Sequence, residues 1–174
     1  MSHVVLVRHG RAAAGWGQDL DPGLDETGAA EAAAVADALA LFGPLPVYSS
    51  PMKRCLQTAA PLAHRWAVDV TVEPRVSEVK APSAELPGRG KWLDRFLHDR
   101  WDDQPEELLA WRDDLVAALV DIAAGGDAVV FTHFVGINAA MGVALGDARV
   151  MVCRPDNCSR TELSVVDGTL SVVQ

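Results

Sequence analysis

Residues 4–10 read Val-Val-Leu-Val-Arg-His-Gly. The four apolar residues form a continuous β-branched and aliphatic run, which is typical of a strand buried on both faces of a mostly parallel sheet. The run stops at Arg8, and polar and flexible residues follow it at once. This stretch therefore predicts a buried strand that places Arg8, His9 and Gly10 at its carboxyl end.

On either side of this strand, short apolar runs alternate with helical patterns, and we expect an α/β fold. It is a three-layer sandwich, a mostly parallel central sheet with helices on both faces and a C-terminal β-hairpin turning at Asp167 and Gly168. We expect the chain, residues 1–174, to be a single domain. The expected further strands are 47–49, 68–72, 129–132, 150–152, 162–166 and 170–173. The expected helices are 25–42, 51–66 with Ser50 as its N-cap, 91–100, 105–125 and 135–145, and residues 73–90 form a long irregular connection.

Composition excludes several classes of protein. With 49% hydrophobic and 22% charged residues, the 174-residue chain is neither disordered nor disulfide-dense. The net charge is −9, from 15 Lys+Arg against 24 Asp+Glu, so the surface repels nucleic-acid backbones and anionic lipids on average. No apolar run approaches the roughly 18 residues of a membrane span, and the N-terminus lacks a signal-peptide apolar region. Cys55, Cys153 and Cys158 are typical of reduced thiols, so we expect a cytoplasmic protein that binds neither nucleic acid nor membranes.

Polar residues follow three of the expected strands. Arg8-His9-Gly10 ends the first, residues 49–54 (Ser-Ser-Pro-Met-Lys-Arg) carry Arg54 into the helix after the second, and His133 follows the run 129–132. Ligands of open α/β sheets bind outside the carboxyl ends of the strands. We therefore expect two histidines and two arginines to converge on one pocket.

Such a pocket suits phosphoryl transfer. A neutral imidazole is a good nucleophile near neutral pH. A guanidinium group donates two parallel hydrogen bonds to a pair of phosphate oxygens. A second histidine, if cationic, adds to the stabilisation of the transferring group. The backbone N–H of Gly10 is a further candidate donor to phosphate.

Three motifs together resemble the histidine phosphatase superfamily, which includes the phosphoglycerate mutase-like enzymes. They are Val-Arg-His-Gly at 7–10, Ser-Ser-Pro-x-x-Arg-x-x-x-Thr-Ala at 49–59 and Thr-His at 132–133. The resemblance implies that His9 is the residue phosphorylated, and that Arg8, Arg54 and His133 form the phosphate pocket. It also implies a reaction without a metal or another cofactor.

The resemblance implies a proton donor as well, a Glu in the loop beyond the third strand, and Glu78 matches that position. Glu73 and Glu85 lie nearby in the same polar loop, so Glu78 as a plain solvated residue is the alternative. Two departures weaken any transfer of substrate specificity. Residues 12–15 (Ala-Ala-Ala-Gly) stand where many relatives have a phosphate-binding Asn, and residues 79–82 (Val-Lys-Ala-Pro) replace a common Gly-x-Trp-Glu-Gly segment.

We therefore expect hydrolysis of a small anionic phosphomonoester through a phosphohistidine, by a phosphatase closest in pattern to the broad-specificity type. The alternatives are a protein phosphohistidine phosphatase, phosphoglycerate-mutase-type transfer, and a phospho-ligand binding module with little turnover. A basic cluster follows Glu78 and either draws in an anionic substrate or forms a solvated helix face. It consists of Lys80, Arg89, Lys91 and Arg95. The pattern leaves the natural substrate and the oligomeric state open.

Overall fold

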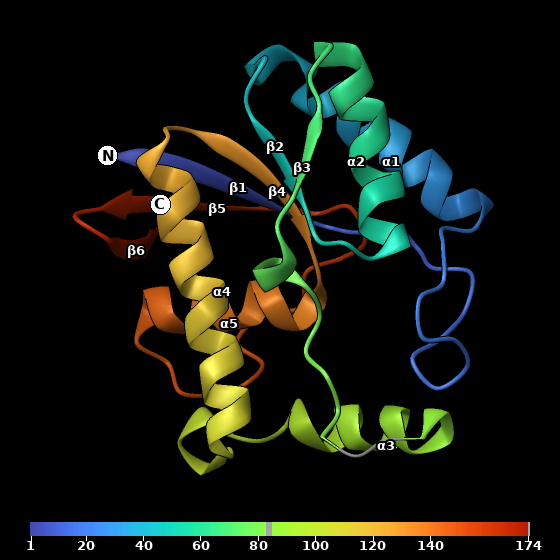
Figure 1. Ribbon diagram of the computed structural model, residues 1–174, viewed down its shortest axis with the longest axis vertical. Helices are drawn as coiled ribbons and strands as arrows, with labels where there is room; N and C mark the ends of the chain where they lie inside the picture. The colour runs from blue at the N-terminus through green and yellow to red at the C-terminus, as the bar shows by residue number, and fades with distance from the viewer. Residues whose placement is uncertain (83–84, 174) are drawn as a thin grey trace.

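The computed structural model describes residues 1–82 and 85–173, and its core is a six-stranded sheet in the order β3-β2-β4-β1-β5-β6 (Figure 1). The four strands from β3 to β1 are parallel to one another. β5 runs antiparallel to β1, and β6 pairs antiparallel with β5 at the edge. The strands are β1 (Ser2–Arg8), β2 (Val47–Ser49), β3 (Val70–Val72), β4 (Ala128–Thr132), β5 (Arg160–Val166) and β6 (Thr169–Val172). The expected mostly parallel sheet and its C-terminal hairpin are confirmed.

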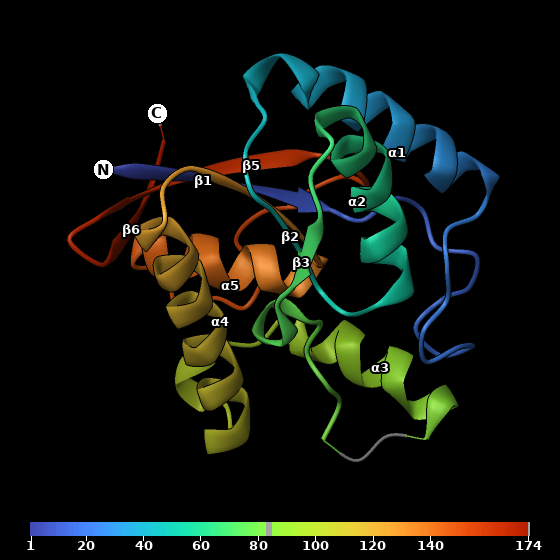
Figure 2. The same cartoon turned by 45° about the horizontal axis from the view of Figure 1, so that its top comes forward.

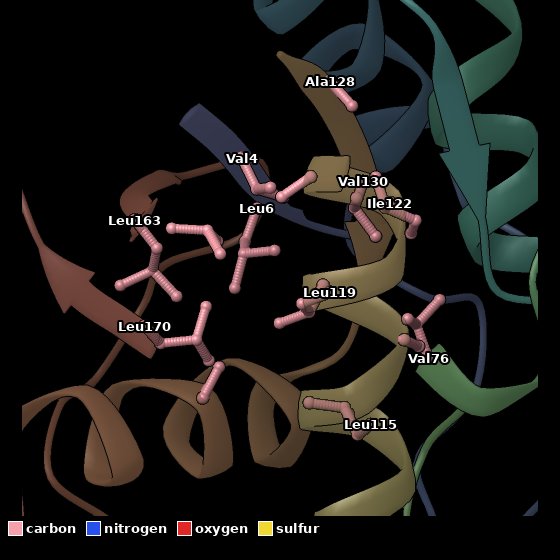
Figure 3. Close-up of a cluster of buried hydrophobic side chains, with 14 of the residues drawn as sticks. Val4, Leu6, Val76, Leu115, Leu119, Ile122, Ala128, Val130, Leu163 and Leu170 are labelled. Carbon is pink, nitrogen blue, oxygen red and sulfur yellow. The ribbon is translucent and has the colours of Figure 1, made fainter. Parts of the chain in front are cut away.

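The helices are α1 (Glu26–Leu39), α2 (Lys53–Trp66), α3 (Leu86–Phe96), α4 (Glu106–Ala124) and α5 (Phe134–Leu145). They cover both faces of the sheet because side chains alternate across each strand. Val4 and Leu6 of β1 pack in the cluster that includes Leu115 and Leu119 of α4 (Figure 3). Val7 faces the opposite way, toward α1 and α2. This alternation explains why the run at residues 4–7 is apolar without interruption.

The start of α2 differs from the prediction. The helix begins at Lys53, and its N-cap is Met52 rather than Ser50. The Ser50 hydroxyl accepts a hydrogen bond from the Met52 backbone N–H at 3.2 Å and contacts His133 at 2.8 Å. Ser50 therefore stabilises the turn before the helix, and its hydroxyl contacts His133 at the carboxyl edge of the sheet.

The prediction of a strand at residues 150–152 is wrong. Beside it, only an isolated bridge joins Arg149 to Arg100. The amide oxygen of Asn138 accepts hydrogen bonds from the backbone N–H groups of Val152 and Cys153, both at 2.8 Å. Because this side chain takes the donors that a neighbouring strand would need, the segment stays outside the sheet.

The connection after β3 is shorter than expected. A 3₁₀ turn covers Pro74–Val76, and α3 starts at Leu86 rather than at residue 91 and ends at Phe96. Residues 83 and 84 of this connection lie outside the described residues. In both Figure 1 and Figure 2, α3 lies apart from the sheet, on the same side of the molecule as the loop after β1. A separate apolar cluster joins α3 to α4 and α5 through Phe96, Leu108 and Val135.

No helix in the part of the chain that the structure describes is both long enough and apolar enough to cross a bilayer.

Candidate active site

The carboxyl ends of β1 and β4 lie side by side, and this pairing brings the two histidines together. Arg8 pairs with Thr132 across the parallel ladder, and the backbone N–H of His9 donates to the Thr132 carbonyl at 3.1 Å. His9 and His133 each follow the last residue of their strand. Their ring centroids lie 5.3 Å apart with an interplanar angle of 62°. The convergence expected from the strand order is therefore present.

The hydrogen bonds of His9 define its protonation. Nδ1 donates to the Gly10 carbonyl at 2.7 Å, and Nε2 accepts from Nε of Arg54 at 3.1 Å. Burial lowers the pKa of His9 to about 3, and the charges of Arg54 and Arg8 add to this effect, against the opposing Gly10 hydrogen bond. The ring is therefore neutral at pH 7, with its unprotonated nitrogen toward Arg54.

Arg54 joins the two histidines. It lies in the first turn of α2 and is 4% exposed. Its Nη2 donates to Nδ1 of His133 at 3.2 Å, which leaves Nε2 of that ring to donate to the Ser50 hydroxyl at 2.8 Å. Burial, followed by the charge of Arg54, lowers the pKa of His133 well below its usual value. The second histidine is therefore neutral here, not cationic.

Thr58 has a structural part in the site that sequence reasoning missed. Its hydroxyl accepts from the Gly10 backbone N–H at 3.0 Å and donates to the Arg54 carbonyl at 2.6 Å. The Gly10 amide is thus engaged by Thr58 rather than turned toward a phosphate. A Cβ at Gly10 would lie 2.6 Å from the Gly28 carbonyl oxygen, so the glycine permits a close approach to α1. Thr58 stands four residues after Arg54, on the same face of α2, and that spacing is the signal that could have revealed it.

Arg8 is positioned by the loop before β5. Its Nη1 donates to the Pro155 carbonyl at 2.9 Å, and its guanidinium carbon lies 5.2 Å from the centroid of the Phe134 ring. Nε of Arg8 is buried and has no partner among the described residues. The sequence carries no pattern that would identify Pro155 as a contact. Because Arg8 also lines the cavity described below, its guanidinium group can contact an anion there.

Glu78 is the buried carboxyl of the connection after β3. It is 7% exposed, and its Oε1 accepts from the Val79 backbone N–H at 3.0 Å. Burial raises the pKa of Glu78 to about 7, against the opposing effects of the Val79 hydrogen bond and the Arg54 charge. Glu73 forms an ion pair with Arg75 at 2.9 Å, and neither residue lines the cavity described below. Of these two carboxyls, Glu78 alone has a pKa raised into the neutral range.

A cavity of about 620 Å³ opens between the sheet edge, the loop after β1 and α3. Arg8, His9, Arg54 and Glu78 all line it, whereas Gly10 and His133 lie behind its wall. Residues 12–15, where many relatives have an Asn, contribute a small, apolar part of the lining. The arrangement presents a nucleophilic nitrogen, two guanidinium groups and a carboxyl to one space.

In the described part of the chain, no group of three or more His, Cys, Asp or Glu side chains has the arrangement of a metal site.

Comparisons with known proteins show which chains this protein resembles. A family model described as the histidine phosphatase superfamily (branch 1) matches residues 4–174. A glucosyl-3-phosphoglycerate phosphatase of Mycobacterium tuberculosis (strain CDC 1551 / Oshkosh) is 33% identical over 132 residues, which cover 70% of this chain and 55% of that protein. An uncharacterized protein of the same species is 44% identical over 78 residues, which cover 41% of this chain and 37% of that protein. The chain thus spans about half or less of the length of these curated relatives.

The solved structures extend the likeness to the whole fold. A mycobacterial glucosyl-3-phosphoglycerate phosphatase in complex with VO3 has a TM-score of 0.75 at 23% identity, covering 98% of this chain and 96% of that one. Bacillus stearothermophilus YhfR has a TM-score of 0.82 at 18% identity, covering 99% of this chain and 95% of that one. Since the family model matches nearly the whole chain, and the sheet-edge motifs lie where the resemblance placed them, the protein belongs to the histidine phosphatase superfamily.

Proposed function

We propose that the protein hydrolyses small phosphomonoesters through a phosphohistidine formed on His9. The observation that carries this proposal is the neutral His9 ring, whose unprotonated Nε2 lies 3.1 Å from Nε of Arg54 in a cavity that also contains Glu78. A binding module would need the arginines but would not need this nucleophile. The names of the relatives, which are phosphatases, support the same reaction class.

In the first step, the Nε2 lone pair of His9 forms a bond to phosphorus while the bond from phosphorus to the ester oxygen breaks. Arg54 must turn its Nε–H from His9 to a phosphoryl oxygen, since the lone pair is then used for bonding. The protonated Glu78 gives its proton to the leaving oxygen, which would otherwise depart as an alkoxide. A pKa of about 7 makes this proton available near neutral pH.

In the second step, the Glu78 carboxylate takes a proton from a water molecule. The water oxygen forms a bond to phosphorus as the bond between phosphorus and Nε2 breaks. Inorganic phosphate leaves, and both His9 and Glu78 return to their starting protonation states. Nδ1 stays hydrogen-bonded to the Gly10 carbonyl, so this contact keeps the ring oriented through both steps.

We assign the phosphoryl oxygens to Arg8 and Arg54, whose guanidinium groups line the cavity. His133 lies behind Arg54, and we propose that it positions this arginine and contacts the phosphoryl group only once Arg54 has moved. Since His9 supplies the nucleophile and the arginines supply the positive charge, the mechanism calls for no metal or other cofactor.

The buried Glu78 favours an ester substrate over phosphohistidine in a protein. Imidazole is already a good leaving group and needs no strong acid, whereas an alkoxide does need one. The cavity of about 620 Å³ suits a small phosphorylated molecule. We further propose that the 174 residues act as one domain in the cytoplasm, which agrees with three cysteines that form no disulfide.

The experiment is to hydrolyse a panel of phosphomonoesters with EDTA present and to trap the intermediate. The protein is mixed rapidly with p-nitrophenyl phosphate and denatured in alkali, because alkali preserves phosphohistidine. The mass of the peptide that contains His9 is then measured by mass spectrometry. We expect hydrolysis in EDTA and one phosphoryl group on His9. Turnover with no phosphoryl group on His9, together with an equally active His9→Ala variant, would contradict the proposal.

A further inference from the structure

One connection of the chain, residues 146–159 between α5 and β5, holds both the backbone and the side chain of Arg8. The Arg8 backbone N–H donates to the Ser159 carbonyl at 3.2 Å, and the Cys158 backbone N–H donates to the Arg8 carbonyl at 3.0 Å. Nη1 of Arg8 donates to the Pro155 carbonyl at 2.9 Å. The position of the Arg8 guanidinium group therefore depends on where this connection lies.

The later half of the connection is anchored by Asn138 of α5. Asn138 is completely buried, and its Oδ1 accepts from the backbone N–H groups of Val152 and Cys153, both at 2.8 Å. The earlier half is anchored elsewhere, by backbone hydrogen bonds to the segment between α3 and α4. Since no helix or strand lies within residues 146–159, Asn138 fixes the point from which the chain runs on to Pro155.

Asn138 also holds the residue on which Arg8 stacks. The guanidinium carbon of Arg8 lies 5.2 Å from the centroid of the Phe134 ring, and both side chains line the cavity. Nδ2 of Asn138 donates to the Phe134 carbonyl at 3.0 Å. One buried amide is therefore bonded both to the start of α5, on which the guanidinium group stacks, and to the connection that accepts its hydrogen bond.

We propose that Asn138 is a positioning residue for Arg8, and that its amide aims the guanidinium group at the phosphoryl oxygens. This inference rests on the proposed function, since that function assigns those oxygens to Arg8. Asn138 does not line the cavity, so it acts through Arg8 rather than on the substrate. The pairing of β5 with β1 extends from Val165 to Arg160, so the sheet has support of its own without Asn138.

The variant Asn138→Ala shows how this positioning works. The backbone N–H groups of residues 152 and 153 lose their acceptor, and an unpaired donor that water cannot reach is costly. The segment should therefore move until water reaches these groups. Pro155 lies two residues further along, so its carbonyl moves as well, and Arg8 loses the partner that orients its Nη1.

The test is a double-mutant cycle on the affinity for inorganic phosphate, measured by calorimetry with the full chain. We expect Asn138→Ala to weaken phosphate binding about fivefold or more, and Arg8→Gln to weaken it further. In the double variant, Asn138→Ala should add less than about twofold to the loss that Arg8→Gln causes, because the two residues act as a unit. A residue that only stabilises the fold would not show this dependence on Arg8.

Arg149→Gln is the matched control. Arg149 lies in the earlier half of the same connection, where its Nε donates to Asp147 at 3.0 Å, and it does not line the cavity. The control should bind phosphate within about twofold of wild type. Urea unfolding of each variant checks that the protein is folded. Where Asn138→Ala does not fold, Asn138→Ser enters the same cycle, since its hydroxyl is too short to reach both N–H groups.

Two results would overturn the inference: an unchanged phosphate affinity in Asn138→Ala, or an equal loss in the presence and absence of the Arg8 side chain. A wild-type protein that binds no phosphate would overturn it as well. The proposed function fails separately, if the wild-type protein binds phosphate but hydrolyses no ester, and the cycle would still decide whether Asn138 acts through Arg8.

Discussion

The two ends of the cavity are built in different ways. At the end where we propose that phosphate binds, the phosphate end, His9 and Arg54 line the cavity and His133 lies behind them. All three are less than a tenth exposed and are joined by hydrogen bonds through Arg54. At the opposite end, which we call the α3 end, Arg89 lies on a helix outside the sheet, and its guanidinium group stacks on Trp16.

Under the proposed function, this difference separates the residues that carry out the chemistry from those that select the substrate. In-line transfer depends on atoms held within a fraction of an ångström, and a sheet edge with buried hydrogen bonds supplies that rigidity. Selection among leaving groups depends on charge and shape, which substitutions in α3 or in the connection before it can change without disturbing the strands. Glu78 lies at the boundary, since it is buried like the phosphate end but belongs to the connection after β3.

Removing the nucleophile should have the largest effect and should leave the phosphate end otherwise intact. His9→Ala should lower kcat by about 10⁴ or more, the scale seen when a covalent nucleophile is removed. Phosphate or vanadate should still bind, because Arg8 and Arg54 remain. Steady-state kinetics and calorimetry check the two parts. Near wild-type hydrolysis by His9→Ala would show that the covalent mechanism is wrong.

Glu78→Gln should reveal what the boundary carboxyl contributes. Hydrolysis of alkyl phosphates should fall by about 10² to 10⁴, the usual range for general acid catalysis, because an alkoxide needs a proton to leave. Hydrolysis of p-nitrophenyl phosphate should fall much less, since p-nitrophenolate is stable without one. Equal losses on both substrates would mean that Glu78 acts in the hydrolysis of the phosphohistidine or in positioning the substrate. No loss on either would remove it from the mechanism and favour the phosphohistidine phosphatase alternative.

Arg54→Lys tests whether the phosphate end needs the forked shape of a guanidinium or only its charge. We expect kcat/KM to fall by about 10² for every substrate, comparable to the loss of one oxyanion donor. Lysine keeps the charge but cannot contact His9 and His133 together as Arg54 does. An unchanged kcat/KM for p-nitrophenyl phosphate would place Arg54 outside the reacting centre.

The same division explains what the sequence could predict. The strand ends were accessible because an apolar run followed by Arg8-His9 has a simple physical meaning, and parallel strands bring such ends together. The Thr58 contacts with Gly10 and Arg54 were not foreseen, although the four-residue spacing between Arg54 and Thr58 was visible in the sequence.

The rest depended on contacts between distant segments. Nothing near Asn138 indicates that its side chain takes the backbone donors of residues 152 and 153, which is why the strand expected there was wrong. The stacking of Arg89 on Trp16 joins residues far apart in sequence, so the basic cluster could be read equally well as a solvated face. Local sequence pattern therefore predicted the phosphate end of the cavity better than its α3 end.

The burial of Glu78 also predicts a pH-dependent stability. The pKa of Glu78 is about 7 in the folded protein, compared with 4.5 for an unburied glutamate. Below pH 4.5, Glu78 is protonated in both the folded and the unfolded protein. Between pH 4.5 and 7, the carboxyl loses its proton in the unfolded protein but keeps it in the folded one. The free energy of unfolding therefore falls as pH rises through this window. The total is at most about 3 kcal/mol. Glu78→Gln should remove this loss, making the variant more stable than wild type at pH 8 but not at pH 4.

Urea unfolding of both proteins at the two pH values measures this, because other titrating groups cancel in the difference. Glu85→Gln is the control, since its carboxyl is exposed in the same connection. A Glu78→Gln difference that does not change with pH would mean that the carboxyl is not buried as described.

The smallest effect should come from Thr58, which touches no reacting atom. Thr58→Val keeps the shape but leaves the buried Gly10 N–H without an acceptor and removes the bond to the Arg54 carbonyl. We expect a loss of about 1–3 kcal/mol in the free energy of unfolding, the usual penalty for an unsatisfied buried donor. Since the same bonds link the Arg54 backbone to the Gly10 backbone beside His9, kcat should also fall, by about tenfold or less. Thr58→Ser restores the hydroxyl and should recover both quantities. If Thr58→Val were as stable and active as wild type while Thr58→Ser was not, the rigidity of the phosphate end would have to come from packing rather than from these hydrogen bonds.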